Sequence, residues 1–411
     1  MAVEPPRTSG IEMVYVVRND GALQAHYQVT TTSDVQWQRL TPGGLLEDIP
    51  FSRNGTDTWV TVGQDDAGYV VNDGSRFYYF WIVNYNNHEL RFDGLAPVQE
   101  SGDCERMALR LDGTAGKIEY QTLNRRPMTL SRELALEYTT MAYDAERGEY
   151  VAAEANEMLE YVDGAFRTQA PLADTDFTLS GDRFLRAWGE EQSVTSASVA
   201  ATAVAAVTSA TQTEREADNE QTSDGGAEGA FGGSGPVEIT FRAAVTDAVV
   251  YKEWQFAYDP AFDVIDLRIQ ENEVVHEFSE YGTTYVRFVA GNNDGSCDYT
   301  GETYEVFIGE SRLDCPNAFS PEGSPGVNDE WKVSYKSITE FDCRIFNRWG
   351  QEIIHLTHPS QGWDGRFRGK YVPAGVYYYV IKAKGTDGVE YKRSGDINII
   401  KYKDSRERSG S

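Results

Sequence analysis

Hydrophobic and polar residues alternate over short stretches along most of the chain, and turn-forming residues separate these stretches. In the first hundred residues, runs such as Glu12–Val17, Thr58–Val62 and Phe77–Val83 are separated by segments rich in Asn, Asp and Gly. A two-residue period places alternate side chains on opposite faces of a strand, whereas an amphipathic helix has a period of 3.6 residues. The pattern therefore predicts an all-β protein of tandem immunoglobulin-like (Ig-like) β-sandwich domains.

The same pattern predicts four domains and one linker. We expect an Ig-like sandwich at residues 8–100, a second sandwich at 101–212, a third at 237–312 and a fourth domain at 313–405. Residues 213–236 contain six glycines, six acidic residues and one Phe, but no other large apolar side chain. Such a segment buries too little apolar surface to fold, which predicts a flexible linker.

Two residues of the first domain have the features of an Ig core. Trp37 lies in the middle of a strand-like run and is expected to be the core tryptophan. The pattern Asp65-x-Ala67-x-Tyr69 is similar to the tyrosine corner of Ig sandwiches, although Val71 stands where such domains carry a cysteine.

Five short motifs follow one another in the last hundred residues. They are Pro316-Asn-Ala-Phe-Ser-Pro321, Gly326-Val-Asn-Asp329, Ile345-Phe-Asn-Arg-Trp-Gly350, Gly362-Trp-Asp-Gly365 and Pro373-Ala-Gly-Val-Tyr377. In this order, within residues 313–405, they resemble the gliding-motility-associated C-terminal domain, which is the type B sorting domain of the Bacteroidetes type IX secretion system. The resemblance implies export across the outer membrane to the cell surface or the extracellular space.

The resemblance also implies a partner and a set of motif residues. The partner is the outer-membrane type IX secretion machinery, with a PorP/SprF-like component. In the family, Asn-Gly-Asp usually precedes Gly-Val-Asn-Asp, but this chain has Glu322-Gly-Ser-Pro-Gly326. The motif residues carried over to this chain are Pro316, Asn317, Phe319, Asn328, Asp329, Phe346, Asn347, Arg348, Trp349, Gly350, Gly362, Trp363, Asp364, Gly365, Gly375 and Tyr377.

Trp349 and Trp363 each precede a glycine. We expect each ring to cover one end of the domain core while the glycine permits a tight turn, and direct contact with a secretion receptor is the alternative. Export by this route also requires that the chain first cross the inner membrane. The N-terminus, MAVEPPRTSG, lacks the basic and apolar regions of a signal peptide, so we expect the native precursor to carry one upstream of Ala2.

Charge is distributed unevenly along the chain. The net charge is −28, yet residues 313–411 contain 15 basic and 13 acidic residues, which leaves 22 basic and 52 acidic residues upstream. An acidic body repels the phosphates of nucleic acids, so we expect no nucleic-acid partner. We interpret the charge as that of an exposed, well-solvated surface protein, with cation binding as the alternative.

The four cysteines show no C-x-x-C spacing, which argues against a zinc site. Cys315 opens the sorting domain and Cys343 lies in its next long strand, so we predict a disulfide between them. The alternative is two buried free thiols, which pack as small apolar groups. Cys104 and Cys297 are expected to be unpaired, or weakly paired across domains.

No residue pattern indicates an active site. The five histidines are scattered, without H-E-x-x-H, and no phosphate-binding loop is present. Residues 237–312, with Trp254-Gln-Phe256, His276-Glu-Phe278 and Tyr285-Val286, resemble a PKD-type Ig-like domain, in which His276 belongs to the packing. We therefore expect no catalytic, cofactor-binding or metal residues and no cofactor. Calcium at residues 292–296 or at Asp65-Asp66 is the alternative, although neither has the EF-hand spacing.

These observations favour a non-enzymatic surface or secreted protein whose Ig-like modules serve adhesion or ligand binding. A secreted hydrolase with a divergent pair of acidic residues and a structural spacer of the cell envelope are the alternatives. We expect a surface glycan or protein ligand to bind residues 1–312 through exposed aromatics such as Tyr79 and Trp81, which share one strand face. The alternative is that this face belongs to the core.

Overall fold

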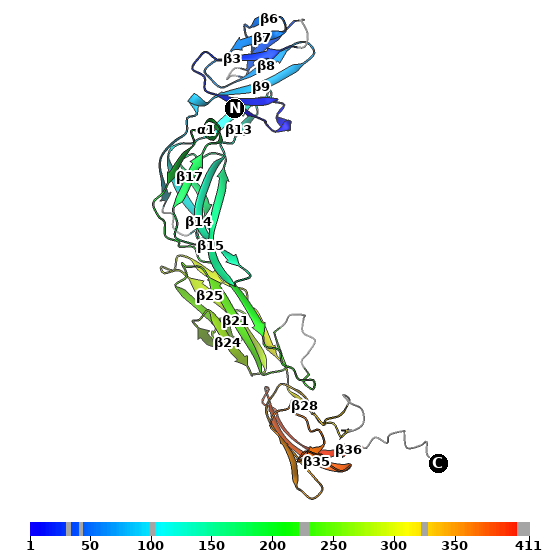
Figure 1. The fold of residues 1–411 in the computed structure, drawn as a ribbon. Coiled ribbons are helices and arrows are strands. Elements are labelled where there is room, and N and C mark those ends of the chain that lie inside the picture. Colours follow the sequence, from blue (N-terminus) through cyan, green and yellow to red (C-terminus); the bar gives the residue numbers. More distant parts are fainter. Residues whose placement is uncertain (30–33, 41–43, 99–102, 222–230, 322–327, 401–411) are drawn as a thin grey trace, which may run out of the picture. The chain divides into compact units, whose positions relative to one another are not determined.

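The computed structural model describes residues 1–29, 34–40, 44–98, 103–221, 231–321 and 328–400. Strands dominate this part of the chain, and its helices are α1 (Arg183–Trp188) and two 3-10 turns, η1 (Arg7–Ser9) and η2 (Tyr85–Asn87). The predicted all-β class of tandem Ig-like sandwiches is confirmed (Figure 1). None of the described helices is long and apolar enough to cross a membrane.

The chain divides into two compact units. The first comprises Met1–Ala205 together with Thr246–Ala248 and Asn292–Cys297, and the second comprises Ala206–Val245, Val249–Gly291 and Asp298–Ser411. Each unit contains more than one sheet pair, so the units do not coincide with the predicted domains. The predicted domain boundaries stay a prediction.

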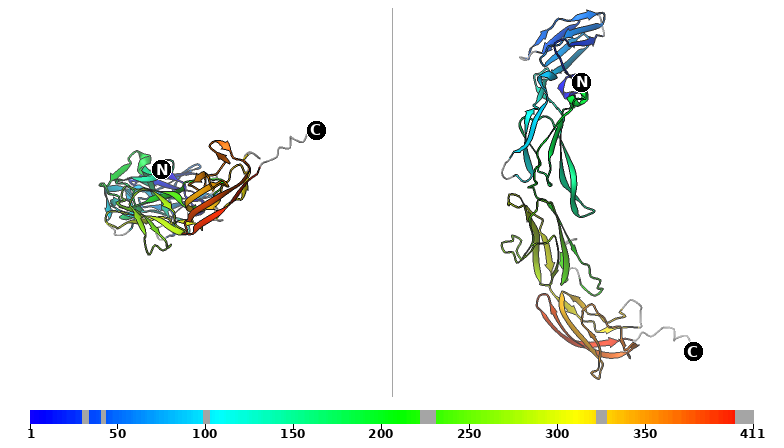
Figure 2. Two further views of the ribbon diagram at one scale, coloured as in Figure 1. Left: turned by 90° about the horizontal axis from the view of Figure 1, so that it is seen from below. Right: turned by 60° about the vertical axis from the view of Figure 1, so that its left-hand side comes forward.

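The N-terminal part of the first unit is a sandwich of two unequal sheets. Its strands face each other in two layers, which Figure 2 shows from a second side. The larger sheet has the order β1 (Ala2–Val3), β2 (Met13–Val17), β9 (Phe77–Asn84), β8 (Ala67–Asn72), β4 (Gln36–Leu40) and β5 (Leu46–Asp48). The smaller sheet has the order β3 (Gln24–Gln28), β7 (Asp57–Thr61) and β6 (Ser52–Asn54).

The core of this sandwich has two features of Ig domains. Trp37 on β4 is 1% exposed, and its indole Nε1 donates a hydrogen bond to Thr58 Oγ1 at 3.1 Å. The hydroxyl of Tyr69, on β8, accepts a hydrogen bond from the backbone N of Gly63 at 3.2 Å, which is the bond of a tyrosine corner. The predictions for Trp37 and Tyr69 are therefore confirmed.

A second sandwich completes the first unit. One sheet has the order β10 (Arg91–Val98), β11 (Arg106–Thr114) and β16 (Ala165–Gln169). The other has the order β15 (Glu149–Leu159), β14 (Leu134–Asp144), β17 (Phe177–Gly181) and β18 (Gln192–Thr195), and β12 (Ile118–Gln121) forms a hairpin with β13 (Pro127–Leu130).

The two sandwiches of the first unit share one hydrophobic core. On one face of β9, Tyr79, Trp81 and Val83 belong to the cluster that contains Leu109 and Tyr120 of the second sandwich. The hydroxyl of Tyr79 also donates a hydrogen bond to the carbonyl of Gln121 at 2.6 Å. The opposite face of β9, with Phe80 and Ile82, packs in the core of the first sandwich. Both faces of β9 are therefore covered by protein.

A buried ion pair lies beside this shared core. Arg132 and Asp182 are 2% and 0% exposed, and Arg132 Nη1 lies 2.6 Å from Asp182 Oδ2. The guanidinium also donates to the carbonyls of Gly116 and His88, both at 2.7 Å, and the Tyr85 hydroxyl donates to Asp182 Oδ2 at 2.9 Å. These bonds offset the desolvation of two buried charges.

The second unit begins with a further sandwich. One sheet has the order β19 (Ala206–Gln212), β21 (Val237–Val245) and β24 (Glu273–Phe278). The other has the order β20 (Phe231–Gly233), β27 (Tyr304–Ile308), β25 (Gly282–Gly291), β22 (Tyr251–Ala257) and β23 (Leu267–Ile269), with β26 (Asp298–Thr300) paired to β25. His276 is half-buried between the rings of Phe256 and Phe278, at 4.8 and 4.7 Å, as its structural assignment predicted.

The described parts of the predicted linker are ordered on the second unit, which corrects the expectation of a free tether there. Asn219 Nδ2 donates to the carbonyls of Val333 and Pro359 at 2.7 and 2.8 Å. On the other side of residues 222–230, which lie outside the described residues, β20 pairs with β27 in parallel. A Cβ added at Gly232 would lie 2.1 Å from the Phe307 carbonyl oxygen, so glycine here permits strand pairing and does not signal disorder.

The sorting domain forms the rest of the second unit. Its main sheet has the order β29 (Ala318–Phe319), β36 (Glu390–Ile399), β35 (Gly375–Gly385), β31 (Ile338–Phe346) and β32 (Glu352–Leu356). Two short pairs accompany it: β28 (Arg312–Asp314) with β30 (Ser334–Lys336), and β33 (Arg366–Phe367) with β34 (Lys370–Tyr371). This domain has its own hydrophobic core, which includes the fully buried Trp331 and Trp363.

Candidate functional site

Several sorting-motif residues build the core of the sorting domain. Phe319, Trp363 and Tyr377 are 3%, 0% and 7% exposed. Their rings form a chain, with centroids 5.4 Å apart for Phe319 and Trp363 and 5.1 Å apart for Trp363 and Tyr377. The indole of Trp331 donates to the carbonyl of Pro316 at 2.7 Å, which joins the first motif to the same core. The expected core position of Trp363 is confirmed.

Other motif residues close turns. The side-chain oxygen of Asn347 accepts hydrogen bonds from the backbone N of Trp349 and of Gln351, both at 3.0 Å. Gly350 follows with φ of +79°, in the left-handed region that glycine tolerates. Asp364 Oδ1 accepts from the backbone N of Arg366 at 3.0 Å. The remaining motif residues lie in loops or at strand ends: Asn317, Asn328, Asp329, Phe346, Gly362, Gly365 and Gly375. The segment Glu322-Gly-Ser-Pro-Gly326 lies outside the described residues.

Trp349 differs from the other motif aromatics. Its side chain is 76% exposed at the turn between β31 and β32, so the expectation that it covers the core is wrong. The guanidinium carbon of Arg348 lies 4.2 Å from the centroid of the Trp349 ring, a cation–π arrangement. Since the turn needs only Asn347 and Gly350, the packing of the domain does not account for Trp349.

The predicted disulfide between Cys315 and Cys343 is wrong. Both are free thiols, and both contribute to the core of the sorting domain. Burial raises the pKa of Cys343 to about 12, and burial also raises the pKa of Cys315. Disulfide chemistry proceeds through the thiolate, so these buried thiols are poorly reactive. The alternative of buried free thiols holds.

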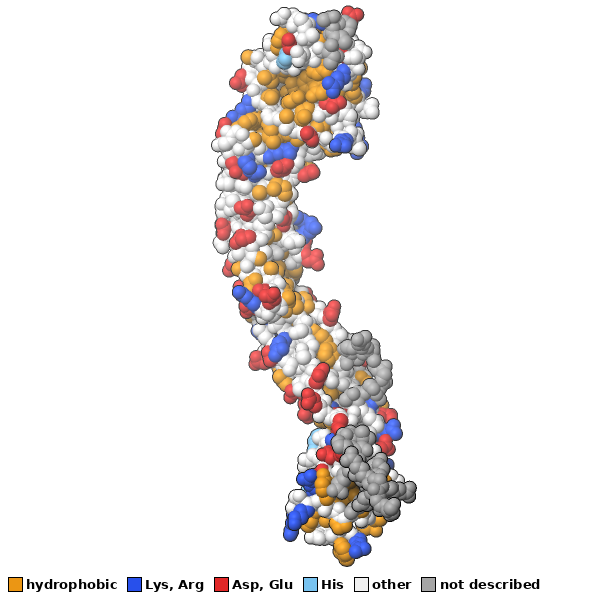
Figure 3. All heavy atoms as spheres, turned by 45° about the vertical axis from the view of Figure 1, so that its right-hand side comes forward, with side chains coloured by type: hydrophobic (Ala, Val, Ile, Leu, Met, Phe, Trp, Pro, Cys, Tyr) orange, Lys and Arg blue, Asp and Glu red, His pale blue; other side chains and the backbone are white. Residues whose placement is uncertain are grey.

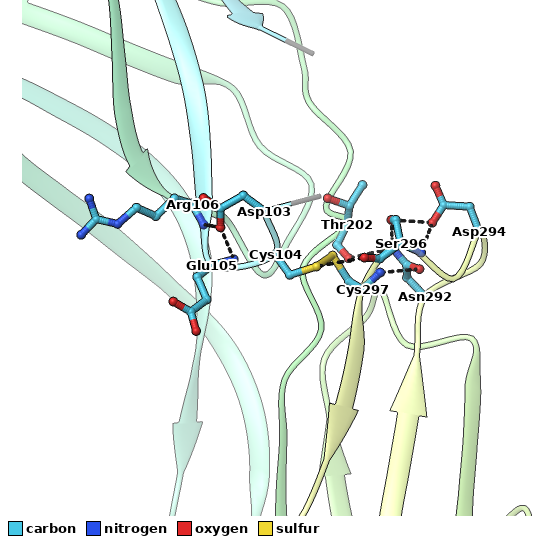
Figure 4. Close-up of a disulfide and its surroundings, with 9 residues drawn as sticks. All are labelled: Asp103, Cys104, Glu105, Arg106, Thr202, Asn292, Asp294, Ser296 and Cys297. Carbon is cyan, nitrogen blue, oxygen red and sulfur yellow. Dashed lines mark hydrogen bonds between the residues drawn. A yellow bond between two sulfur atoms is a disulfide. The ribbon is translucent and has the colours of Figure 1, made fainter. Parts of the chain in front are cut away.

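Cys104 and Cys297 form a disulfide (Figure 4). Of the two states expected for them, the unpaired one is wrong, and pairing between the predicted domains 101–212 and 237–312 is the one observed. Their Cα atoms lie 5.6 Å apart, within the usual range for a disulfide. Cys297 ends a loop, residues 292–297, in which Asn292 Oδ1 accepts from the Cys297 N at 3.3 Å and Asn292 Nδ2 donates to the Thr202 carbonyl at 3.0 Å. Four cysteines allow three pairings, and a sequence separation of 193 gave no signal for this one.

Tyr79 and Trp81 are not exposed ligand contacts, and the prediction that they form a binding platform is wrong. They are 1% and 6% exposed. They share a strand face as predicted, but that face is covered by the second sandwich of the same unit. The alternative assignment to the core is correct. Among the described residues, no group of three or more His, Cys, Asp or Glu side chains is placed to hold a metal ion.

The opposite face of β9 borders a groove between the two sheets of the first sandwich. The groove has a volume of about 440 Å³. Figure 3 shows hydrophobic side chains gathered on the surface of this N-terminal sandwich. We call this site the aromatic groove, and it is lined by Tyr15, Val17, Leu23, Gln24, Ala25, His26, Tyr27, Val62, Tyr78, Phe80 and Ile82.

Three tyrosines and one phenylalanine line the aromatic groove, with Tyr27 on the smaller sheet and Tyr15, Tyr78 and Phe80 on the larger one. Ring centroids lie 5.5 Å apart for Tyr27 and Tyr78, 5.6 Å for Tyr78 and Phe80, and 5.8 Å for Tyr15 and Phe80. Tyr15, Tyr27 and Tyr78 are each half-buried, so part of each ring remains available to a ligand. Burial is the main cause that raises the pKa of Tyr78 above its ordinary value, and the neighbouring Tyr15 adds to the shift.

Sequence reasoning missed the aromatic groove because it placed its candidate ligand contacts, Tyr79 and Trp81, on the other face of Phe77–Val83. The signal was present in the aromatic residues at both parities of that run, since Tyr78 and Phe80 alternate with Tyr79 and Trp81. A strand with apolar side chains on both faces is buried on both or exposes one to a partner.

Two family comparisons match parts of the chain. Residues 96–196 match the fibronectin type III domain, and residues 313–399 match the CHU_C type IX secretion signal domain. The first match falls on the predicted second sandwich, for which the sequence had suggested no family. The second confirms the resemblance to a type IX sorting domain. The PKD-type resemblance of residues 237–312 stays a prediction.

Solved structures with similar chains have low identity. A tetra-tandem repeat in the extending region of a large adhesion protein is 12% identical, covers 94% of this chain and 99% of its own, and gives a TM-score of 0.21. Dimeric latent PorU from Porphyromonas gingivalis is 11% identical, with 79% and 35% of the two chains covered and a TM-score of 0.18. The I9–I11 tandem of titin is 7% identical, with 72% and 95% covered and a TM-score of 0.15.

No curated protein matches the chain. The sorting-domain geometry and the family match agree on the C-terminal residues. Residues 313–399 are a type IX secretion signal domain, which implies export of the chain across the outer membrane to the cell surface or the extracellular space.

Proposed function

We propose that this protein is a non-enzymatic adhesion or ligand-binding protein, exported by the type IX system and binding its ligand in the aromatic groove. The observation that carries the proposal is the partly open cluster of Tyr15, Tyr27 and Tyr78 in the groove. Aromatic rings provide large contact areas at a low cost in side-chain entropy, and binding pockets are lined mainly by such side chains.

Two buried carboxylates are excluded as the acid pair of a hydrolase. Asp182 is fully buried and paired with Arg132, and Glu253 is 2% exposed and paired with Arg268. A general acid or base must reach the proton that it transfers in a bound substrate. Neither carboxylate is accessible to a substrate, and the Glu253 pair joins the neighbouring strands β22 and β23.

Export requires recognition of the sorting domain, and we propose that Trp349 with Arg348 forms a contact for the outer-membrane secretion machinery, with a PorP/SprF-like component as its partner. The ring is exposed, is held over a cation and is not needed for packing. Exposed tryptophan and arginine side chains are frequent anchors of protein interfaces.

The export proposal is tested by expressing the chain behind a signal peptide in a host with the type IX system. We expect Trp349→Ala to accumulate in the periplasm with an unchanged melting temperature. Tyr371→Ala is the matched control, since Tyr371 is 43% exposed, has Arg366 4.4 Å above its ring and lies outside the motifs. Normal surface delivery of Trp349→Ala would rule out this contact.

The adhesion proposal is tested by comparing attachment of cells under flow to glass and to a lawn of the same cells. Cells that lack the protein should attach less. We expect Ala25→Phe, which fills the aromatic groove, to behave like the deletion at equal surface amount, while Gln28→Ala, on the outward side of β3, behaves like the wild type. Unchanged attachment of the deletion strain to both surfaces would end the adhesion proposal.

A further inference from the structure

The smaller sheet of the first sandwich lacks one strand of the Ig arrangement. Ig constant-type sandwiches have strands A, B, E and D in one sheet and C, F and G in the other. In this chain β3, β7 and β6 follow one another as B, E and D do, and β4, β8 and β9 as C, F and G do. The first long strand, β2, pairs in parallel with β9 of the larger sheet and not with β3. Among the described residues, the position of strand A beside β3 is vacant.

The backbone of β3 presents hydrogen-bonding groups to this vacant position. The carbonyl of Leu23 accepts from Val62 N, and Val29 N donates to the carbonyl of Thr56, both at 2.9 Å. In an antiparallel ladder these bonds recur at every second residue, so the odd-numbered residues of β3 bond to β7. The N–H and C=O groups of the intervening residues point toward the open edge: Gln24, His26 and Gln28.

Within the described residues, this edge lacks several of the usual protections against strand pairing. Exposed edges commonly carry Lys, Pro, inward-facing charges or a bulge. The sequence of β3, Gln24-Ala-His-Tyr-Gln28, contains no Lys, Pro, Asp or Glu, and its register with β7 is regular. The His26 ring stacks on Trp59 at 5.2 Å and bonds Asp57 at 2.7 Å. Both partners belong to β7, so the ring lies over β7 and not over the open edge.

The aromatic groove lies next to the same strand. Ala25 and Tyr27 of β3 line it from one sheet, and Tyr15, Val17 and Phe80 line it from the other. A strand added beside β3 directs every second side chain toward the opposite sheet, and therefore into the groove. Backbone pairing at an edge combined with pockets for alternate side chains is the mode of recognition called β-strand addition.

We propose that the β3 edge and the aromatic groove together bind an extended segment of a partner protein by β-strand addition. The segment carries large apolar side chains at alternate positions. Residues 1–98 contain 12 acidic and 6 basic residues, so basic residues flanking the segment favour its association. The inference rests on the proposed function, because it names the class of partner for the same groove.

A glycan fits this site less well. Sugars expose many hydroxyl groups that need hydrogen-bonding partners when they are buried. The polar groups of the lining are mainly tyrosine hydroxyls, Gln24 and His26. The unpaired backbone of β3 has, in contrast, the spacing that an extended peptide matches.

The test uses the full chain and a phage-displayed library of random linear 12-residue peptides. We expect selected peptides to share alternating large apolar residues. A synthetic copy of the strongest binder is then studied by hydrogen exchange with residue-level fragmentation. The amides of Gln24, His26 and Gln28 should exchange at least tenfold more slowly with the peptide bound, while those of Ala25 and Tyr27, already bonded to β7, should not change.

Two substitutions at one position separate the backbone from the side chain. Gln28→Pro removes the outward N–H without removing a bond to β7, and proline is tolerated at sheet edges. The Gln28 side chain does not line the groove. We expect Gln28→Pro to weaken binding of the synthetic peptide at least tenfold, whereas Gln28→Ala keeps the affinity within about twofold. If Gln28→Pro lowers the melting temperature of the chain, the exchange pattern of the wild type decides alone.

Each other outcome overturns the inference. Selection that enriches no peptide, or protection that does not fall on the three alternate amides, excludes strand addition. Concentration-dependent protection of those amides in the protein alone identifies a second copy of this chain as the occupant. If the protein binds glycans on an array through the groove and binds no peptide, the ligand-binding function stands and the proposed peptide partner is wrong. If Ala25→Phe leaves cell attachment unchanged, the function of the groove fails independently.

Discussion

β9 and β35 are both aromatic strands, but the structure uses them differently. In β9, consecutive residues from Tyr79 to Ile82 are at most 6% exposed, so both faces are buried. In β35, Tyr377 and Ile381 are buried, while Val376, Tyr378 and Val380 on the other face are each more than 40% exposed. The outer face of β9 is covered by a second sandwich, whereas the corresponding face of β35 is exposed to solvent.

The cysteines also differ between the first unit and the sorting domain. The first unit contains the disulfide, whereas the sorting domain keeps two reduced thiols in its core. The first unit is thus stabilised by contacts and a covalent bond between segments distant in sequence, and the sorting domain by contacts among its own short motifs. Motifs that encode turns and a local core are visible in a sequence, while long-range covering of a strand is not.

The largest expected effect concerns the disulfide. A disulfide between residues 193 positions apart lowers the conformational entropy of the unfolded chain. In the loop-entropy model this stabilises the folded state by about 5 kcal/mol. We expect dithiothreitol, or Cys104→Ser with Cys297→Ser, to lower the melting temperature of the first unit in calorimetry. The transition of the sorting domain should not shift. A shift of the sorting domain under reductant would show that its thiols are paired after all.

Truncation on the two aromatic strands should give the next largest difference. Trp81→Ala removes a fully packed ring and should lower the free energy of unfolding by about 3–5 kcal/mol. Tyr378→Ala removes a ring that is 46% exposed and should change it by less than about 0.5 kcal/mol. Denaturant unfolding followed by tryptophan fluorescence measures both. Equal effects would mean that the outer face of β9 is not covered in solution.

The buried thiols predict an alkaline loss of stability in the sorting domain. Cys343 has a pKa of about 12 when folded against an ordinary value of 9.0. Because the folded value is the higher one, the stabilisation is complete below pH 9 and declines as the pH rises toward 12. At pH 10 this thiol is largely ionised in the unfolded chain but not in the folded one, which lowers the free energy of unfolding by about 1.4 kcal/mol relative to neutral pH. The difference between wild type and Cys343→Ala, measured by urea unfolding at pH 8 and pH 10, should shrink by this amount.

The smallest effects should be the same in both regions. The Tyr69 hydroxyl accepts from Gly63 N, and the Tyr377 hydroxyl donates to the Pro373 carbonyl at 3.0 Å. Tyr69→Phe and Tyr377→Phe each remove one such bond, and each should lower stability by about 1 kcal/mol. Thermal melts of the two variants against wild type provide the measurement. A much larger loss for one of them would place its hydroxyl in a wider network.

The sequence predicted those features that depend on neighbouring residues. Strand alternation predicted the all-β class, and the positions of Trp37 and Tyr69 predicted an Ig-like core. The ordered motifs predicted the sorting domain. Glycine content in residues 213–236 was misleading, because Gly232 is required by close backbone approach in a parallel strand pair.

Features that depend on distant residues were not predictable. The burial of Trp81 depends on residues of the second sandwich, and the pairing of Cys104 depends on a loop 193 positions away. The aromatic groove arises because β2 joins the larger sheet, a choice between two possible neighbours that the pattern of β2 itself does not reveal.

The Cys104–Cys297 bond also determines how the chain carries tension. A pull applied between the first sandwich and residues 313–399 passes from Cys104 directly to Cys297, so the residues between them bear no load while the bond is intact. After reduction, a pull strong enough to unfold those residues can extend them, to at most about 600 Å of chain at roughly 3.3 Å per residue. The intact bond therefore limits how far the molecule can extend, and once it is reduced a protease cut between the two cysteines breaks the covalent path.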